Sequence, residues 1–223
     1  MTDVHVLVPV KALSLAKTRL AHILEPSTRS DLVVAMLIDT LAAALGLPGA
    51  VATVVTSDPI ATDVALGHGA RVLPDPVYRG ESDPLNAALD VAAAHVRAHS
   101  PGTDLVALQA DLPALRSSEL AAALTEARLF GRAIVADHTG TGTAALFQCT
   151  PDGPLEPMFG VDSARRHVRS GAKALTEPLD GLRLDVDTID DLEAAVRLGT
   201  GAATSRVLDR IGFALPERSP GIH

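Results

Sequence analysis

Short runs of apolar residues alternate with longer segments of mixed polarity along most of the chain. The runs are rich in Val, Leu, Ile and Ala, a pattern typical of strands buried on both faces of a parallel sheet. Predicted strands lie at 4–10, 50–56, 71–74, 104–110, 133–136, 143–149 and 182–186. Predicted helices, in which apolar residues recur at intervals of three and four residues, lie at 27–45, 58–67, 83–98, 117–130, 162–170 and 188–198.

The order of these elements predicts an α/β fold of three layers. Strands and helices alternate through the first 130 residues, which indicates a mostly parallel sheet with helices on both faces. Two predicted strands then follow each other closely, which indicates an antiparallel portion in the second half. The chain of 223 residues suits a single domain, here 1–215, and the segment 216–223 is expected to be a flexible C-terminal tail.

Composition narrows the classes of function. Hydrophobic residues make up 47% of the chain and charged residues 21%, so a sizeable core can form. The net charge of −8 and the 2% aromatic content argue against nucleic-acid binding. Cys149 is the only cysteine, which excludes an intrachain disulfide and a cysteine-based zinc site. The sequence shows no signal peptide and no apolar stretch that could span a bilayer, so we expect a cytoplasmic protein without a membrane partner.

Polar residues that follow the predicted strands carry the candidate chemistry, because open α/β sheets bind ligands at the carboxyl ends of their strands. Lys11, Lys17 and Arg19 gather with Ser14 and Thr18 in the loop after the first strand. Cations and hydroxyls of this kind can neutralise and bind a triphosphate. The loop lacks the glycines of a Walker motif, and composition alone supports a solvated basic turn equally well.

Asp111 follows the strongly apolar strand at 104–110. A carboxylate at such a position can hold Mg²⁺, which prefers carboxylate oxygens and bridges to substrate phosphates. The alternative is that Asp111 caps the next helix. Pro113 and the later Ser117 make this alternative weaker, because they move the expected start of that helix downstream.

Asp185 and Asp187 stand two residues apart in the last predicted strand. Alternation along a strand would place both carboxylates on one face, where they repel unless a cation lies between them. They are therefore candidate partners of Asp111 in a metal site. Asp190 and Asp191 are assigned instead to the start of the following helix, where Thr188 and Asp191 resemble a capping box.

Two glycine-containing segments are candidates for binding a second anion. The segment 139–143 combines glycines with hydroxyls and ends at Thr143. Farther along the chain, Gly160 permits a turn and Ser163 lies at a predicted helix N-terminus, with Arg165 and Arg166 nearby. The alternatives are a flexible turn for the first segment and a simple helix cap with solvated arginines for the second.

Several further polar residues have mainly structural interpretations. Asn86 lies in the first turn of a predicted helix, where its amide can contact the edge of a base, although asparagine there is usually structural. Thr28 or Ser30 is expected to cap the helix at 27–45. His167 is expected to be a surface or packing residue rather than a catalytic one.

Taken in order, these segments resemble one enzyme family over nearly the whole chain. The matching stretches are Val10-Lys11, 16–20, 83–86, 109–113, 140–143, Phe159-Gly160, Asp162-Ser163 and 185–188. They are similar to the phospholactate and phosphoenolpyruvate guanylyltransferases of coenzyme F420 biosynthesis. The resemblance implies a Rossmann-like nucleotide-diphospho-sugar transferase fold. The glycine-rich first loop of the wider fold family, which ends in Arg-Met-Gly, is absent, and Lys11, Lys17 and Arg19 take its place.

The resemblance also implies the reaction and the roles of the site residues. GMP would pass from GTP to phosphoenolpyruvate or 2-phospho-L-lactate, with release of pyrophosphate. By resemblance, Thr143, Gly160 and Ser163 hold the phosphorylated acid. Asp111 and Asp185, helped by Asp187, hold Mg²⁺. The nucleotide is assigned to Lys17 and Asn86.

Other functions remain open at this level. One alternative is a nucleotidyltransferase for a different acceptor, such as a molybdopterin or a sugar phosphate. Another is a nucleotide-binding regulatory module without turnover. A transferase that acts later in the F420 pathway is a candidate partner. No motif distinguishes phosphoenolpyruvate from phospholactate, and the oligomeric state cannot be read from the sequence.

Overall fold

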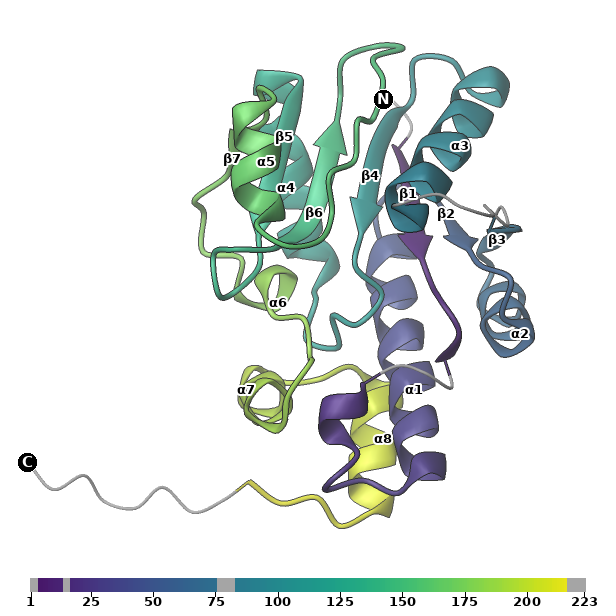
Figure 1. Ribbon diagram of the computed structural model, residues 1–223, viewed down its shortest axis with the longest axis vertical. Coiled ribbons are helices and arrows are strands. Elements are labelled where there is room, and N and C mark those ends of the chain that lie inside the picture. Colours follow the sequence, from purple (N-terminus) through teal and green to yellow (C-terminus); the bar gives the residue numbers. More distant parts are fainter. Residues whose placement is uncertain (1–3, 14–16, 76–82, 216–223) are drawn as a thin grey trace, which may run out of the picture.

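The computed structural model describes residues 4–13, 17–75 and 83–215 (Figure 1). The predicted tail at 216–223 lies outside these residues. The strands are β1 (Val4–Pro9), β2 (Ala50–Val55), β3 (Arg71–Leu73), β4 (Asp104–Leu108), β5 (Arg132–Ala136), β6 (Thr143–Gln148) and β7 (Lys173–Ala174). The helices are η2 (Thr18–Leu20), α1 (Pro26–Leu45), α2 (Pro59–Gly67), α3 (Pro84–His99), α4 (Ser117–Phe130), α5 (Ser163–Arg169), α6 (Asp180–Arg183), α7 (Ile189–Leu198) and α8 (Ala202–Arg210).

The strands form a single sheet in the order β3-β2-β1-β4-β6-β5-β7. Strand β1 pairs in parallel with β2 and β4, and β6 pairs antiparallel with both β4 and β5. The predicted parallel sheet with an antiparallel portion is therefore confirmed. Because β6 is flanked by two strands of opposite direction, β5 runs the same way as β1 and β4. The carboxyl ends of these three strands and the start of β6 consequently share one edge of the sheet.

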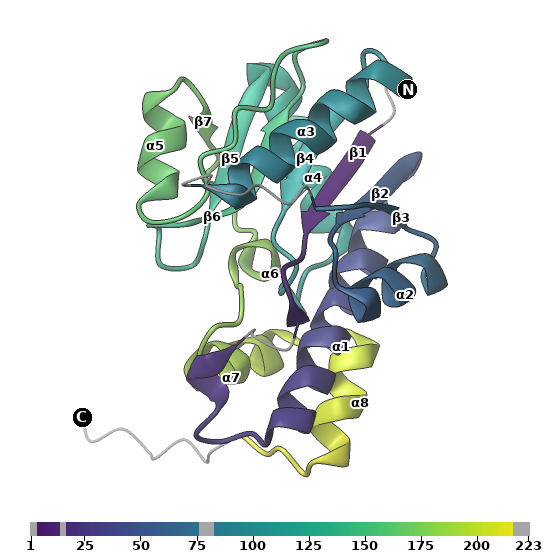
Figure 2. The same ribbon diagram turned by 45° about the vertical axis from the view of Figure 1, so that its right-hand side comes forward.

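Helices cover both faces of the sheet and complete the predicted three layers. One face packs against α1, α2 and α4 through a large aliphatic core that continues into α6, α7 and α8. The opposite face packs against α3 and α5 (Figure 2). All five residues of β4 are buried, which explains why this strand reads as an uninterrupted apolar run. None of the described helices is long and apolar enough to cross a membrane.

Local sequence signals determine where several helices begin. Proline occupies the first turn of α1, α2 and α3, where its missing N–H costs nothing. Asp58 caps α2 by accepting hydrogen bonds from two backbone N–H groups. Thr188 and Asp191 form the predicted capping box of α7. The expected cap of α1 at Thr28 or Ser30 is wrong, because Pro26 starts the helix earlier and Glu25 is its N-cap residue.

The last predicted strand, 182–186, is also wrong. Leu182, Leu184 and Val186 are all buried, as their alternation predicted. Leu182 nevertheless belongs to α6, and the residues after it form a loop that does not pair with the sheet. The backbone N–H of Val186 instead donates to the carbonyl of Asp111 at 3.1 Å. The predicted burial of alternate residues is therefore correct. The predicted pairing of this segment with a strand of the sheet is not.

The strand β7 and the helices η2 and α8 were not predicted at all. Strand β7 contains only two residues and gives no periodic signal. Helix α8 is largely polar and packs against α1, where the buried carboxylate of Asp39 accepts hydrogen bonds from the N–H groups of Ala203 (3.0 Å) and Thr204 (2.8 Å). A side chain from a distant helix thus caps α8, which the local sequence around residue 200 cannot reveal.

Candidate functional site

A cavity of about 590 Å³ opens at the carboxyl ends of β1 and β4. Its polar lining includes Lys11, Lys17, Gln109 and Asp111, and its apolar lining comes from the end of β1 and from α1. The position agrees with the expectation that ligands bind beyond the carboxyl ends of the strands. The cavity is large enough for a nucleotide-sized ligand.

The turn that carries Asp111 is held by α1. Thr40, which is fully buried in α1, donates its hydroxyl to the carbonyl of Ala110 at 3.2 Å and accepts the N–H of Leu112 at 3.1 Å. Strand β4 ends at Leu108, so Asp111 stands three residues beyond the strand rather than directly at its end. The two hydrogen bonds of Thr40 fix this short connection, and with it the direction of the Asp111 side chain.

Lys17 connects two of the predicted metal-binding carboxylates. Its ammonium group donates to Asp111 and, at 2.6 Å, to Asp187. Burial opposes the charge of Lys17, but the two carboxylates outweigh it and raise the pKa of Lys17 to about 12. Burial likewise works to raise the pKa of Asp187, and the charges of Lys17, Arg19 and His138 outweigh it, so this pKa lies below its ordinary value. The site therefore holds a permanently charged lysine between carboxylates 76 residues apart, Asp111 and Asp187.

Asp185 lies in a different electrostatic environment. Burial, followed by the negative charges of Asp111, Asp137 and Asp187, raises its pKa to about 6. Its Oδ1 atom is buried without a hydrogen-bond partner among the described residues. A buried carboxylate oxygen that accepts no hydrogen bond, in a carboxylate near other negative charges, is a good ligand for a cation. Asp111 and Asp185 thus suit a divalent metal ion.

The predicted three-carboxylate arrangement differs in detail from the structure. In the described part of the chain, no three His, Cys, Asp or Glu side chains are grouped as a ready metal site. Asp185 and Asp187 do not share a strand face, because 182–186 is not a strand, and Asp187 turns toward Lys17 instead. Mg²⁺ is commonly held by one or two carboxylates together with substrate phosphates, so two carboxylates suffice.

The three residues predicted to hold the acid lie on connected segments. Thr143 opens β6, and its hydroxyl lies 3.0 Å from Nδ1 of the buried His167 in α5. The N–H of Ser163 donates to the carbonyl of Gly160 at 3.1 Å, and the next N–H along, that of Ala164, donates to the carbonyl of Thr141 at 3.1 Å. The structure therefore places the turn before β6 against the start of α5. Whether these residues bind an acid stays a prediction.

Gly160 and His167 have clear structural roles in this arrangement. Gly160 has φ of +114°, which side-chain-bearing residues rarely adopt. His167 is fully buried, as a packing residue would be, and its Nε2 accepts the N–H of Met158 at 2.8 Å. Burial, together with the charges of Arg132 and Arg166, lowers the pKa of His167 to about 4, so the ring is neutral near pH 7. It holds Thr143 and the segment before Gly160 in place.

Asn86 makes contacts that differ from its predicted role. Its Oδ1 accepts the N–H of Phe159 at 2.8 Å, and its Nδ2 donates to the carbonyl of Phe159 at 3.0 Å and to Asp83 at 2.5 Å. Both N–H groups and one of the two acceptor positions of this buried amide are therefore used within the protein. Asn86 positions the segment that leads to Gly160, and its N–H groups could donate to a base only if these bonds broke.

Of the two remaining cations of the first loop, Lys11 lines the cavity and Arg19 lies near Asp187. Lys11 is exposed at the cavity wall and lies near Asp75, on whose carboxylate its charge acts. Asp58 fixes the start of the loop, because its Oδ2 accepts the N–H of Leu13 at 2.9 Å. Arg19 is exposed in the short helix η2, and its charge reaches Asp187. Lys11 and Arg19 are thus free to approach a polyanionic ligand.

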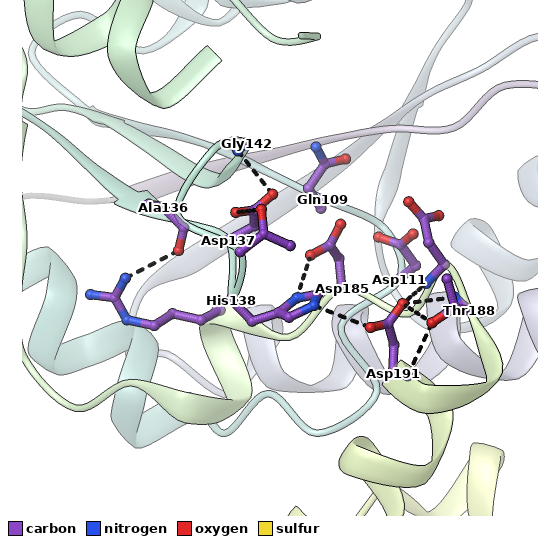
Figure 3. A network of polar contacts seen from close by, with 12 residues as sticks. Gln109, Asp111, Ala136, Asp137, His138, Gly142, Asp185, Thr188 and Asp191 are labelled. Carbon is purple, nitrogen blue, oxygen red and sulfur yellow. Dashed lines mark hydrogen bonds and ion pairs between the residues drawn. The ribbon is translucent and has the colours of Figure 1, made fainter. Parts of the chain in front are cut away.

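Sequence reasoning missed three polar residues of this edge, namely Gln109, Asp137 and His138 (Figure 3). Gln109 lines the cavity. Asp137 and His138 follow β5 directly, and His138 lies between Asp185 and Asp191, with Nδ1 3.6 Å from Asp185 Oδ1 and Nε2 3.1 Å from Asp191 Oδ1. The signal that could have found them is the rule already applied to Asp111, since they too come just after a buried strand.

Comparison with solved structures defines the class of protein. The chain matches a protein from Desulfovibrio desulfuricans G20 described as a nucleotide-diphospho-sugar transferase, with a TM-score of 0.72, 17% identity, and coverage of 95% of this chain and 96% of that one. It also matches Rv0371c of Mycobacterium tuberculosis H37Rv, solved as a complex with manganese, with a TM-score of 0.50, 19% identity, and coverage of 88% and 99%. The predicted nucleotide-diphospho-sugar transferase fold is confirmed.

Sequence comparison then identifies the family. A family model of proteins described as "Guanylyl transferase CofC like" matches residues 4–222. The chain is 50% identical over 222 residues to the phosphoenolpyruvate guanylyltransferase of Rhodococcus opacus (strain B4), covering 95% of this chain and 92% of that protein. The chain belongs to the CofC-like guanylyltransferase family, and the predictions of family and enzyme class are confirmed.

Proposed function

We propose that the protein transfers GMP from GTP to phosphoenolpyruvate and releases pyrophosphate, as a step of coenzyme F420 biosynthesis. The observation that carries this proposal is the 50% identity to a phosphoenolpyruvate guanylyltransferase along nearly the full length of both chains. The cavity beside Lys11, Lys17 and Asp111 supports it, because it offers cations and carboxylates at the edge where this fold binds ligands. Both substrates occur in the cytoplasm, where we place the protein.

The reaction needs no general base. A phosphate oxygen of phosphoenolpyruvate, already ionised at neutral pH, forms a bond to the α-phosphorus of GTP. The bond from that phosphorus to the bridging α–β oxygen breaks, and pyrophosphate leaves with the electron pair. Catalysis therefore depends on alignment of the two substrates and on neutralisation of charge at the phosphates.

Different residues of the site are assigned to the two substrates. We assign the triphosphate to Lys11, Lys17 and Arg19, whose positive charges offset the charge that builds up on the leaving pyrophosphate. We assign the acceptor to Thr143 and to the Gly160–Ser163 turn, with its backbone held by His167 and Asn86.

Asp111 and Asp185 would hold the metal ion, which we take to be Mg²⁺. When bound, the ion supplies charge neutralisation at the phosphates without proton transfer. The manganese complex of the structurally similar Rv0371c supports use of a divalent ion by this fold. An ion at Oδ2 of Asp111 would compete with the ammonium group of Lys17, which contacts that oxygen and could then bind the triphosphate instead.

The test is a direct assay with alternative acceptors. Protein, GTP and MgCl₂ are mixed with phosphoenolpyruvate, 2-phospho-L-lactate or 3-phosphoglycerate, and pyrophosphate release is followed together with the mass of the product. We expect release with phosphoenolpyruvate and a product that contains GMP joined to the acid through a diphosphate. Release with phospholactate alone would transfer the proposal to that acceptor. No release with any of the three acids would refute the proposed activity.

A further inference from the structure

A pair of adjacent residues, Asp137 and His138, connects the two ends of the proposed site. They follow β5 and precede the turn that leads into β6. The carboxylate of Asp137 accepts the N–H of Thr141 at 3.1 Å and the N–H of Gly142 at 2.9 Å. In return, the N–H of Asp137 donates to the carbonyl of Gly142 at 3.1 Å. Asp137 thus closes the turn that ends at Thr143, on the acceptor side of the site.

His138 contacts the opposite, carboxylate side. Its backbone N–H donates to the carbonyl of Arg183 at 2.7 Å, which connects the last residue of α6 to the segment after β5. Its ring lies between Asp185 and Asp191, at 3.6 Å and 3.1 Å respectively (Figure 3). The imidazole is therefore held at one nitrogen and presents the other to Asp185.

Asp191 makes a rigid anchor for this ring. Its Oδ2 accepts the backbone N–H of Asp187 at 3.0 Å, and both the N–H (2.7 Å) and the hydroxyl (2.8 Å) of Thr188. The other carboxylate oxygen of Asp191 is the one that faces His138. The start of α7 therefore determines where the imidazole lies, and a change at His138 alters the surroundings of Asp185 without removing the capping box.

We propose that His138 is a positioning residue that orients Asp185 for metal binding. Its neighbour Asp137 holds the turn before Thr143, so the two residues connect the metal side of the site with the acceptor side. The argument rests on the proposed function, in which Asp185 is a metal ligand. Asp185 has a buried Oδ1 atom without a hydrogen bond among the described residues, and the His138 ring is the group that faces this atom. Outer partners that orient a ligating carboxylate commonly contribute about 10- to 100-fold to metal affinity.

Two substitutions at His138 distinguish its proposed role in orienting Asp185 from a role in packing. His138→Ala removes both ring nitrogens, whereas His138→Asn keeps an amide near the position of Nδ1, facing Asp185. His68→Ala is the matched control, because His68 is an exposed histidine at the end of α2 whose ring Nδ1 lies 2.8 Å from the carbonyl of Val64, away from the proposed site. Mn²⁺ affinity is measured by electron paramagnetic resonance in the presence of GTP and without acceptor, and kcat and KM are measured separately.

We expect His138→Ala to weaken Mn²⁺ binding about 10-fold and to lower kcat, while KM for GTP at saturating metal changes little. His138→Asn should recover most of the affinity, and the control should match the wild type. Unchanged Mn²⁺ affinity in both His138 variants would overturn the proposal. The binding measurement needs no turnover, so it tests His138 even if the wild type fails to release pyrophosphate, a result that would refute the proposed function instead. If the alanine variant does not fold, His138→Phe takes its place, because it keeps a ring but no nitrogen; an affinity below one-third of the wild type then supports the proposal, and equality refutes it.

Discussion

The ammonium group of Lys17 contacts carboxylates that we assign to a metal ion, so we expect lysine and metal to oppose each other when no nucleotide is bound. The perturbation that tests this is Lys17→Met, which removes the charge and keeps most of the side-chain volume. The fold raises the pKa of Lys17 from 10.5 to about 12. Because one pKa unit corresponds to about 1.4 kcal/mol, the folded environment as a whole, in which the attraction of the carboxylates outweighs burial, favours the charged lysine by about 2 kcal/mol.

The direction in which this stabilisation changes with pH follows from the raised pKa of Lys17. A pKa raised in the folded state contributes stability that is complete below the unfolded value of 10.5 and is lost as the pH rises toward 12. At pH 7.5 the full interaction is therefore present. A metal ion that displaces Lys17 from its carboxylates must overcome up to about 2 kcal/mol, which corresponds to roughly 30-fold in affinity.

The assay is a Mn²⁺ titration without GTP, followed by electron paramagnetic resonance, on the wild type and on two variants. Lys17→Met should bind Mn²⁺ more tightly by up to about 30-fold, yet lose turnover because the triphosphate lacks its partner. Lys11→Met is the control, since the charge of Lys11 acts on Asp75, and its Mn²⁺ affinity should stay near that of the wild type. Equal Mn²⁺ affinity in the wild type and Lys17→Met would refute the idea that this ammonium opposes the metal.

Three further outcomes are expected. Asp111→Asn should reduce pyrophosphate release at least about 100-fold with little change in melting temperature, and unchanged activity would remove Asp111 from the site. Asp39→Ala should lower the free energy of unfolding by about 2 kcal/mol in a urea titration, because two N–H groups of α8 lose their acceptor, while activity at 25 °C persists. Burial, with smaller contributions from neighbouring positive charges, lowers the pKa of His5 to about 4, so stability should be complete above pH 6.5 and fall as the pH drops toward 4. His5→Gln should make this fall shallower, and an identical pH profile would contradict the assignment.

The parts of the fold that the sequence predicted best are those where one local signal dominates. The apolar runs of β1, β2 and β4 have no competing interpretation, because strands buried on both faces cannot be mistaken for exposed loops. Prolines at the starts of α2 and α3 likewise leave little freedom in where these helices begin. Such signals depend on neighbouring residues only, and they agree with the tertiary structure.

The errors arise where distant residues decide the outcome. Leu182 and Val186 alternate as in a strand, but their backbone pairs with no neighbouring strand and Val186 binds the carbonyl of Asp111. Helix α8 depends on Asp39, a residue of α1. Asn86 carries an amide in the first turn of a helix, where it could bind a base. This amide instead forms hydrogen bonds with the backbone of Phe159. In each case the hydrogen-bond partner is far away in sequence, so no local pattern could identify it.

The location of the candidate site follows from one topological feature, the single antiparallel strand β6. The predicted pair at 133–136 and 143–149 implied a hairpin, but the sequence could not say which of its strands runs with β4. Since β6 is the strand that pairs with β4, the hairpin turn lies at the carboxyl edge of the sheet, beside Asp111. The same choice brings His138, at one end of the turn, toward Asp185, and Thr143, at the other end, toward α5. If β5 had instead paired antiparallel with β4, the turn would lie at the opposite edge, and neither residue could take part in the site.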